Sequence, residues 1–267
     1  MLSDFVADSR RLVVLTGAGC STQSGIPDYR SPGGAWTRHK PVYYNDFVRS
    51  EDVRRFYWAR SYRGWPRFLA ARPNAAHRAL AELESRGSVD FLITQNVDDL
   101  HQEAGSRKVV QLHGRNRVVV CLDCRSEFAR SDVQDRLTDL NPAWIAGEFR
   151  IPACDRCGGV LKPAVVFFGE TVPAAKVALA MQRVDEADAL LVVGSSLAVW
   201  SGFRFVKRAA ERRIPIAIVN IGPTRADSLA TLKIEEECGA ALTAAIRRAT
   251  PIRNRAPFGR DTSSDQF

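Results

Sequence analysis

The chain has 267 residues and a formal net charge of +8, and 45% of its residues are hydrophobic. This length suits one large domain or a domain with insertions, and the hydrophobic fraction is enough for a buried core. No apolar run approaches the roughly 20 residues that a membrane-spanning helix needs, so we expect no membrane partner. The first predicted strand follows Arg11, too early for a signal peptide to precede it, and we therefore expect a cytoplasmic protein.

The basic residues are spread along the whole chain, and most of them are arginines. Nucleic-acid-binding proteins usually gather basic residues on one face or in dense runs, often interleaved with aromatic residues. The sequence contains no such run, which argues against direct nucleic-acid binding. The positive charge still favours acidic partners.

The first strong pattern begins with the apolar run Leu12–Leu15, which predicts a buried parallel strand. The small residues of Gly17–Thr22 follow it and would let backbone N–H groups approach a phosphate closely, as in dinucleotide-binding loops. Thr22 replaces the third glycine of the G-x-G-x-x-G pattern, so an ordinary strand–helix turn remains an alternative. The next segment, Ser24–Arg30, contains Pro27 and predicts a loop that covers a bound nucleotide.

Short apolar runs and helical patterns alternate through the rest of the chain. Further strands are predicted at Val89–Gln95, Lys108–Leu112, Ala164–Phe168, Ala189–Val193 and Ile214–Val219, and helices at Asn74–Arg86, Ala174–Glu186 and Gly202–Arg213. This alternation predicts an α/β fold with a Rossmann-type, doubly wound parallel sheet. Ligands bind such sheets beyond the carboxyl ends of the strands. We therefore expect one shared site for the polar residues that follow the strands, namely Asn96, His113, Gly114, Gly169, Glu170, Gly194, Ser195, Ser196 and Asn220.

Two segments interrupt the alternation and predict a second, smaller domain. Residues 34–73 are rich in aromatic residues and predict a helical module, whereas residues 115–162 contain four of the six cysteines. The remaining segments, 1–33, 74–114 and 163–250, would form the Rossmann-type domain. Residues 251–267 are polar, and we expect them to be disordered.

The cysteines predict a metal centre. Cys121 and Cys124 form one C-x-x-C pair, and Cys154 and Cys157 form another. Two such pairs supply four thiolates, which close the tetrahedral shell of a structural zinc ion; redox-active pairs and free thiols are the alternatives. The two other cysteines, Cys20 and Cys238, have no evident metal-ligand partner in the sequence.

His113 is the best candidate for chemistry, because it follows a predicted strand and an imidazole transfers protons near neutral pH. A purely structural role is the alternative. Gln95, Asn96 and Asp98 follow the neighbouring strand. They would bind polar ligand atoms, orient a water molecule, or cap a helix that begins around Asp98.

These motifs together resemble those of the sirtuins. The segments that carry the resemblance are Gly17–Arg30, Thr94–Asp98, Leu112–Gly114, the two C-x-x-C pairs, Lys162–Glu170, Gly194–Ser196 and Asn220, and they occur in the same order as in that family. The resemblance covers roughly residues 10 to 245. Asp46–Ser50, Tyr57–Arg60 and Asn220–Arg225 resemble the class II branch, which contains mitochondrial sirtuin 4 and its bacterial relatives.

The resemblance implies an NAD-dependent protein-lysine deacylase with one structural zinc. It assigns cofactor contacts to Gly17, Ala18 and Gly19 at the pyrophosphate and to Asp28, Tyr29 and Arg30 in the cofactor loop. Gln95, Asn96 and Asp98 would contact the nicotinamide and its ribose. Gly194, Ser195 and Ser196 would contact phosphate and ribose, and Asn220 and Cys238 would lie near the adenosine. The catalytic residues would be His113 as general base, with Asn96 and Asp98. The segment that contains Val165, Phe167, Phe168 and Gly169 would pair with an extended peptide that carries the acylated lysine.

The acyl group and the reaction outcome leave alternatives. Tyr57 and Arg60 are three residues apart, which places them on one helical face and resembles the pair that grips acidic acyl groups in some sirtuins. A packed tyrosine beside a solvated arginine, in an ordinary deacetylase, is the alternative. Mono-ADP-ribosyl transfer and a non-enzymatic zinc-containing NAD sensor or nucleic-acid binder are the other functions to be distinguished.

Overall fold

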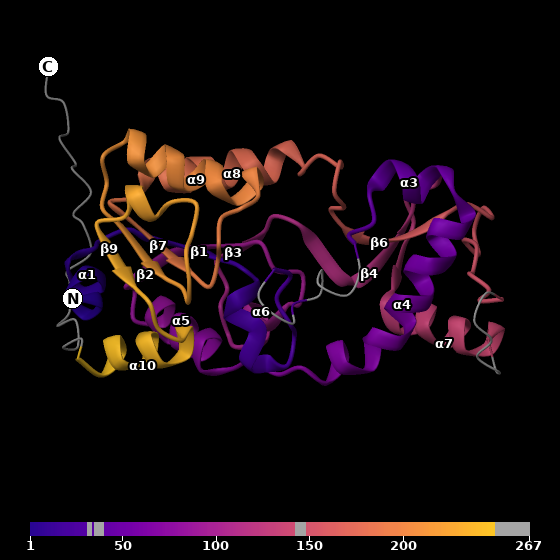
Figure 1. Cartoon of the computed structure of the whole chain (residues 1–267), viewed down its shortest axis with the longest axis horizontal. Coiled ribbons are helices and arrows are strands. Elements are labelled where there is room, and N and C mark those ends of the chain that lie inside the picture. The colour runs from indigo at the N-terminus through magenta and orange to yellow at the C-terminus, as the bar shows by residue number, and fades with distance from the viewer. Residues whose placement is uncertain (31–33, 35–39, 142–147, 249–267) are drawn as a thin grey trace, which may run out of the picture.

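The computed structural model describes residues 1–30, 34, 40–141 and 148–248. The strands within these ranges form two separate β-sheets. One is a six-stranded sheet with the order β3-β2-β1-β7-β8-β9, and the other is a three-stranded sheet with the order β5-β4-β6. The two sheets lie toward opposite ends of the long axis of the molecule (Figure 1). Within the described ranges, no helix has the length and hydropathy needed to cross a membrane.

All strands of the larger sheet are parallel. They are β1 (Leu12–Thr16), β2 (Val89–Thr94), β3 (Val109–Gln111), β7 (Ala189–Val193), β8 (Ile216–Val219) and β9 (Leu232–Ile234). The chain enters at the centre with β1, adds strands on one side, and later adds β7, β8 and β9 on the other. The order therefore reverses between β1 and β7, and the crevice at such a switch point is where doubly wound sheets bind ligands.

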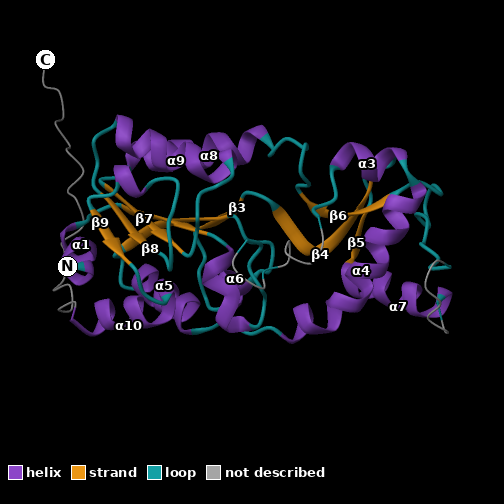
Figure 2. Cartoon of the chain, viewed as in Figure 1, coloured by secondary structure: helices purple, strands orange, loops and turns teal. Residues whose placement is uncertain are grey.

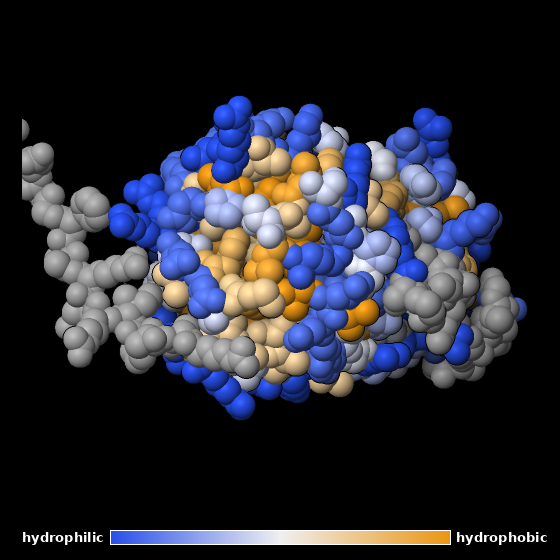
Figure 3. Space-filling model, turned by 60° about the vertical axis from the view of Figure 1, so that its left-hand side comes forward, coloured by the Kyte–Doolittle hydropathy of each residue, from blue (hydrophilic) through white to orange (hydrophobic). Residues whose placement is uncertain are grey.

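Helices cover both faces of the parallel sheet, which explains why β1, β7 and β8 are buried at every position (Figure 2). One face packs against α1 (Leu2–Asp8), α5 (Ala75–Ser85) and α10 (Cys238–Arg248), and the other packs against α8 (Ala174–Glu186) and α9 (Trp200–Glu211). Asn74 caps α5, because its side-chain oxygen accepts from the backbone N–H of Ala76 at 2.9 Å. Figure 3 brings the end of the molecule near β9 forward and shows apolar residues on this surface bordered by hydrophilic ones.

The smaller sheet is antiparallel and has its own apolar core. It consists of β4 (Gly114–Cys121), β5 (Glu127–Ala129) and β6 (Leu161–Val165), with α3 (Tyr44–Arg49), α4 (Glu51–Ala70) and α7 (Arg130–Leu140) beside it. Arg130 is fully buried, and its guanidinium carbon lies 5.3 Å from the ring centre of Trp58 and 4.7 Å from that of Trp65. Stacking on two indoles offsets part of the cost of burying this cation.

The structure confirms the predicted fold class and corrects one strand. The run Ala164–Phe168 was expected in the parallel sheet, which is wrong: the strand is β6, and it pairs with β4 in the smaller sheet. The predicted domain boundary at residues 162–163 consequently falls inside β6. A short apolar run shows where a strand lies but not which partner it pairs with. The remaining domain limits stay an interpretation, and residues 251–267 and part of the predicted helical module lie outside the described residues.

Candidate active site

The loops after β1 and β7 approach each other closely at the switch point. The 3-10 helix η1 (Ala18–Ser24) follows Gly17, and the Gly19 N–H donates to the Gly194 carbonyl at 2.8 Å. A Cβ on Gly17 would lie 2.7 Å from the Ser195 Cβ, and one on Gly19 would lie 2.9 Å from the Gly194 oxygen. Only glycine fits at these two positions. The missing side chains let the loops after β1 and β7 pack backbone to backbone, as the tight turn of a dinucleotide-binding loop requires.

Polar side chains from β2 and its following loop form a buried network with η1. Asn96 Nδ2 donates to the Gly17 carbonyl and to Ser21 Oγ, both at 3.0 Å. Ser21 Oγ in turn donates to Asp98 Oδ2 at 2.7 Å. Burial raises the pKa of Asp98, and the hydrogen bonds from Ser21 and from the Leu100 backbone oppose this shift. The network fixes Asn96 and Asp98 beside the glycine loop.

Asp98 also plays the capping role that was considered for it. Its Oδ1 accepts from the Leu100 backbone N–H at 3.0 Å, at the start of the short helix α6 (Leu100–Glu103). Asp99 lies between them in a left-handed conformation with φ of 64°. Each carboxylate oxygen of Asp98 thus accepts one hydrogen bond from the chain itself, Oδ1 from the Leu100 N–H and Oδ2 from Ser21 Oγ.

His113 lies between the end of β3 at Gln111 and the start of β4 at Gly114. Its Nδ1 is 2.9 Å from the Gln95 carbonyl oxygen, and a carbonyl can only accept, so Nδ1 carries the proton. Its Nε2 is 2.8 Å from Ser201 Oγ and is therefore the unprotonated nitrogen. Burial, with Lys176 and Arg204 nearby, lowers the pKa of His113, although the bond to Gln95 opposes the shift. Near neutral pH His113 is a neutral imidazole with a basic Nε2.

The Gln95 side chain links the predicted nicotinamide residues to the loop after β7. Its Nε2 donates to Ser195 Oγ at 2.9 Å and to the Thr16 carbonyl at 3.3 Å. Ser195 is buried, and Ser196, which follows it, is only half-buried. The structure therefore brings Gln95 and Ser195 into direct contact across the carboxyl end of β1, which lies between β2 and β7.

Asn220 and Cys238 lie together at the carboxyl end of β8. Asn220 Nδ2 donates to the Ile221 carbonyl at 2.8 Å, and Cys238 Sγ lies 3.9 Å from the Val219 oxygen. Burial raises the pKa of Cys238 to about 11, which keeps this thiol neutral. Both residues lie beside the Gly194 loop, because the Gly194 N–H donates to the Val219 carbonyl at 2.9 Å.

The segment Asp28–Arg30 brings the cofactor loop to the helical module. Burial and the Asp98 carboxylate raise the pKa of Tyr29, while the guanidinium groups of Arg60 and Arg30 oppose the shift. The Tyr29 hydroxyl is thus within electrostatic range of both Asp98 and Arg60, although Tyr29 as a residue is 44% exposed.

Tyr57 and Arg60 share a face of α4, as predicted. The Tyr57 ring packs against Phe167 with ring centres 4.9 Å apart, and burial raises the pKa of its hydroxyl to about 12. The Arg60 guanidinium carbon lies 5.8 Å from the Tyr57 ring centre. Arg60 is half-buried, and no ion pair joins it to a carboxylate in the described part of the chain. This leaves a positive charge near the site without a matching negative one.

The predicted peptide-binding segment connects the smaller sheet to His113. The Val166 N–H donates to the His113 carbonyl at 2.8 Å, and the Phe168 carbonyl accepts from the Tyr44 N–H at 2.9 Å. Phe167 is 8% exposed, and its backbone N–H donates to Glu170 Oε2 at 2.8 Å, so its side chain belongs to the core. Gly169 has a left-handed φ of 78°. The substrate contacts of Val165, Phe167, Phe168 and Gly169 stay predictions.

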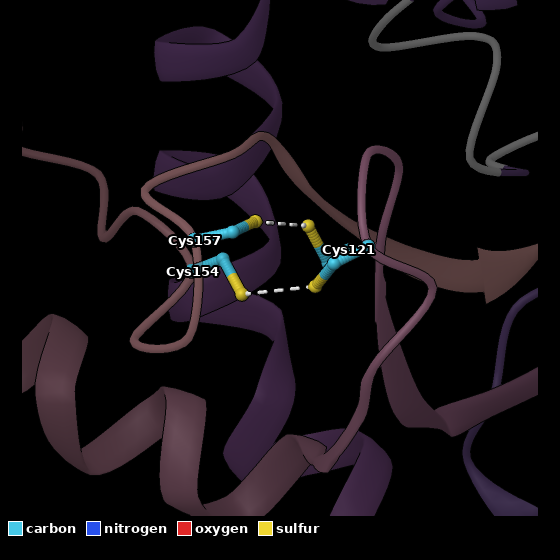
Figure 4. A group of neighbouring side chains, drawn as sticks. Cys121, Cys154 and Cys157 are labelled. Carbon is cyan, nitrogen blue, oxygen red and sulfur yellow. Dashed lines mark hydrogen bonds between the residues drawn. The ribbon is translucent and has the colours of Figure 1, made fainter.

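The four predicted zinc ligands converge from two loops (Figure 4). Cys121 Sγ lies 3.5 Å from Cys157 Sγ, Cys124 Sγ lies 3.7 Å from Cys154 Sγ, and all four sulfurs are within 4.8 Å of one another. A zinc ion about 2.3 Å from each sulfur requires sulfur–sulfur distances of about 3.8 Å. The cluster thus fits one tetrahedral zinc. Strand β4 separates the cluster from His113 by up to about 26 Å, at about 3.3 Å per residue, so an ion held there would be structural.

Several residues of the site were not identified from the sequence. Ser21 and Ser201 hold the catalytic candidates, and His77 and His101 form a further buried group with Cys20. Cys20, for which the sequence shows no metal-ligand partner, therefore lies beside two possible ligands in the folded chain. No local spacing joins these positions, because their contacts arise only when β1, α5, α6 and α9 pack together.

Comparisons with known proteins agree with this geometry. The model of the Sir2 family matches residues 17–201. NAD-dependent protein deacetylase 2 of Bradyrhizobium diazoefficiens is 55% identical over 259 residues, which cover 90% of this chain and 95% of that protein. The mitochondrial NAD-dependent protein lipoamidase sirtuin-4 of Homo sapiens is 49% identical over 259 residues, which cover 89% of this chain and 82% of that protein.

A solved structure described as a Sir2–p53 peptide–NAD+ complex has a TM-score of 0.82 and 34% sequence identity, and the match covers 91% of this chain and 95% of that one. A structure from work on the mechanism and regulation of Sir2 enzymes has a TM-score of 0.81 and 35% identity, with 94% and 97% covered. These matches cover most of the chain, including residues of the fold and of the site. The chain belongs to the Sir2 family of sirtuins.

Proposed function

We propose that this chain is an NAD-dependent protein-lysine deacylase that acts as a deacetylase. The observation that carries the proposal is the state of His113, a neutral imidazole whose basic Nε2 lies at the ligand-binding edge of the parallel sheet. The relatives named as NAD-dependent protein deacetylases support it. So does the solved complex that contains NAD+ and a peptide.

The chain's own residues perform three tasks in this reaction. Bound NAD supplies the ADP-ribosyl group that takes up the acyl group of the lysine, with release of nicotinamide. His113 Nε2 accepts the proton of a ribose hydroxyl, and the Gln95 carbonyl holds Nδ1–H and thereby stabilises the imidazolium that forms. Asn96, Asp98 and Ser21 present fixed polar groups to the nicotinamide end of NAD.

The zinc would act at a distance from this chemistry. Four thiolates leave no open coordination position, so the ion neither binds substrate nor activates water. Its task is to join the loop after β4 to the loop before β6. Because β6 leads directly into the peptide-binding segment, the ion would support the wall of the substrate groove.

Arg60 favours acidic acyl groups as further substrates. Its half-buried guanidinium has no carboxylate partner within the described ranges, lies 5.8 Å from the Tyr57 ring centre, and acts electrostatically on the Tyr57 and Tyr29 hydroxyls. A guanidinium binds a carboxylate with two parallel hydrogen bonds, as a succinyl group would allow. Acetyl-lysine remains the first substrate of the proposal, with succinyl-lysine as a second one.

Mass spectrometry of acyl-lysine peptides tests the proposal. Acetyl-, succinyl- and longer-acyl peptides are incubated with the protein, with and without NAD, and all products are weighed. NAD-dependent loss of one acyl mass together with O-acyl-ADP-ribose is the expected result. Transfer of ADP-ribose to a protein without acyl loss would replace the proposal by mono-ADP-ribosyl transfer. NAD binding without any product would replace it by sensing.

A further inference from the structure

We propose that Cys20, His77 and His101 form a second metal site, separate from the four-cysteine cluster, which binds one Cu(I) ion. The three side chains come from η1, the first turn of α5 and α6. They are 2%, 0% and 1% exposed, respectively. Neither the reaction nor the structural zinc uses any of them.

The donor atoms of this group already lie close together. One donor atom from each residue lies within 4.8 Å of the others, and the two imidazole ring centres are 4.7 Å apart. With metal–donor distances of about 2.0–2.3 Å, as in protein zinc sites, a trigonal arrangement needs donor separations of about 3.5–3.8 Å. Adjustments of about 1 Å or less would therefore complete the coordination. Rotation of the Cys20 side chain alone can supply much of this movement.

His101 is oriented as a ligand by hydrogen bonds on its far side. Its Nε2 lies 2.9 Å from Thr16 Oγ1, and Thr16 Oγ1 donates to Thr94 Oγ1 at 2.8 Å. Thr16 therefore accepts from Nε2–H, which leaves the lone pair on Nδ1. His101 Nδ1 is buried and has no hydrogen-bond partner among the residues that the structure describes. A hydroxyl that fixes the tautomer of a histidine from behind is a usual feature of metal-ligating histidines.

His77 is held only by long hydrogen bonds. Its Nδ1 accepts from the Asn74 N–H at 3.3 Å, and its Nε2 lies 3.4 Å from Ser21 Oγ. Both distances exceed the usual range for strong bonds. Metal binding through either ring nitrogen gives up the bond from the Asn74 N–H, because Nδ1 then either binds the ion or carries the proton, and this bond is long and therefore weak.

Ligand type and coordination number select Cu(I) among the available ions. A soft thiolate favours Cu(I), and the Asp98 carboxylate near Cys20 adds a negative charge that stabilises a bound cation. Two imidazoles and one thiolate in a trigonal set are typical of copper, while zinc prefers four donors. On binding, the Cys20 S–H bond breaks, an S–Cu bond forms, and the proton goes to solvent. Neither the copper ion nor the sulfur changes its oxidation state.

Anaerobic titration of the zinc-loaded full chain with Cu(I) tests the site. The Cu(I) is buffered by bathocuproine disulfonate, and copper and zinc are measured per chain by plasma mass spectrometry. The wild-type chain is expected to bind one copper more than Cys20→Ala, with its zinc retained. Cys238→Ala is the matched control, because it removes another buried thiol of the same core cluster and should keep this copper. Equal copper in the wild type and Cys20→Ala would overturn the proposal.

X-ray absorption at the copper edge provides a readout that needs no variant. One sulfur and two nitrogen neighbours around copper would support the site even if Cys20→Ala fails to fold. A shell of sulfur alone, accompanied by release of zinc, would place the copper in the four-cysteine cluster and refute the proposal. Loss of the copper in Cys238→Ala, with zinc and fold intact, would also refute the assigned ligands.

Discussion

His113 and Ser201 are 88 residues apart in the chain and are joined by a 2.8 Å hydrogen bond between Nε2 and Oγ. Ser201 lies in the first turn of α9, so the helix that covers one face of the parallel sheet also reaches the catalytic base. The nitrogen that must accept a proton is the one that Ser201 holds. Ser201 is therefore a positioning residue for His113, and its hydroxyl must yield to the ribose hydroxyl or relay its proton.

Ser201→Ala should lower kcat about 2–10-fold, which corresponds to the loss of one hydrogen bond of about 0.5–1.5 kcal/mol. It should also raise the pKa of His113, because the serine hydroxyl stabilises the unprotonated Nε2. The acidic limb of the pH–rate profile would then move to higher pH. Ser201→Thr keeps the hydroxyl and should restore both values. An unchanged profile in Ser201→Ala would show that the hydrogen bond does not act on the base.

His113→Ala should reduce deacylation by about 10²–10⁴-fold, the usual contribution of a general base. Its zinc content and circular dichroism should match those of the wild type, because the metal cluster is far from the substitution. Peptide turnover followed by mass spectrometry provides the comparison. A folded, zinc-loaded variant with wild-type turnover would remove His113 from the mechanism.

The buried histidines should make the folded state sensitive to mild acid. Burial lowers the pKa of His77 from 6.5 to about 4 and also lowers the pKa of His101. Between pH 6.5 and 4 the unfolded chain therefore binds protons that the folded chain does not. The free energy of unfolding should fall in this window by about 1.4 kcal/mol per pH unit for each such histidine. Urea unfolding at pH 7 and pH 5 measures the change, and His77→Gln should reduce the slope; equal slopes in both proteins would contradict the assignment.

Arg60→Met should lower the rate on succinyl peptides relative to acetyl peptides by about tenfold or more, the cost of losing one charge-assisted pair of about 1.5–3 kcal/mol. Arg55→Met is a matched control on the same helix, because Arg55 pairs with Glu51 and Asp52 instead of facing Tyr57. The measurement is the ratio of kcat/KM for the two peptides. If both variants keep the wild-type ratio of kcat/KM, Arg60 does not discriminate between the acyl groups.

Removal of the zinc should disrupt the smaller sheet first. A strong chelator, or Cys157→Ala, should lower deacylation and expose the core that packs on β4 and β6, because the two loops lose the ion that would join them. Hydrogen exchange should speed up in β4, β5 and β6 while β1 and β7 keep their protection. Uniform loss of protection in both sheets would mean that the ion stabilises the whole chain.

Most of the fold could be predicted from the sequence, because strands that are buried on both faces appear in it as continuous apolar runs. Helix α8 was predicted at its observed limits, since the helical pattern is uninterrupted and Pro173 precedes it. The elements α1, β4, β5, β9 and α10 were not predicted, and α1 and β9, with seven and three residues, carry too little periodicity to be recognised. Strand β6 was assigned to the wrong sheet, because pairing depends on the partner strand and not on the run itself.

The site could be predicted only as far as its motifs are local. The glycine loop, Asn96 and Asp98, and the two cysteine pairs carry their signal in short spacings. Ser201 and His101 do not, because they act through contacts that packing creates between distant positions. The protonation state of His113 could not be predicted from the sequence either, since it depends on the Gln95 carbonyl and on burial.

His113, the proposed general base, also lies in the short segment that connects the two sheets. Only Leu112 and His113 lie between the last residue of β3 and the first residue of β4, so the base is the joint between the parallel and the antiparallel sheet. The His113 carbonyl is also bonded to Val166, where the chain leaves the smaller sheet again. Any rocking of one sheet against the other must turn this joint. A motion that closed the two sheets on a peptide would therefore also move the imidazole of His113.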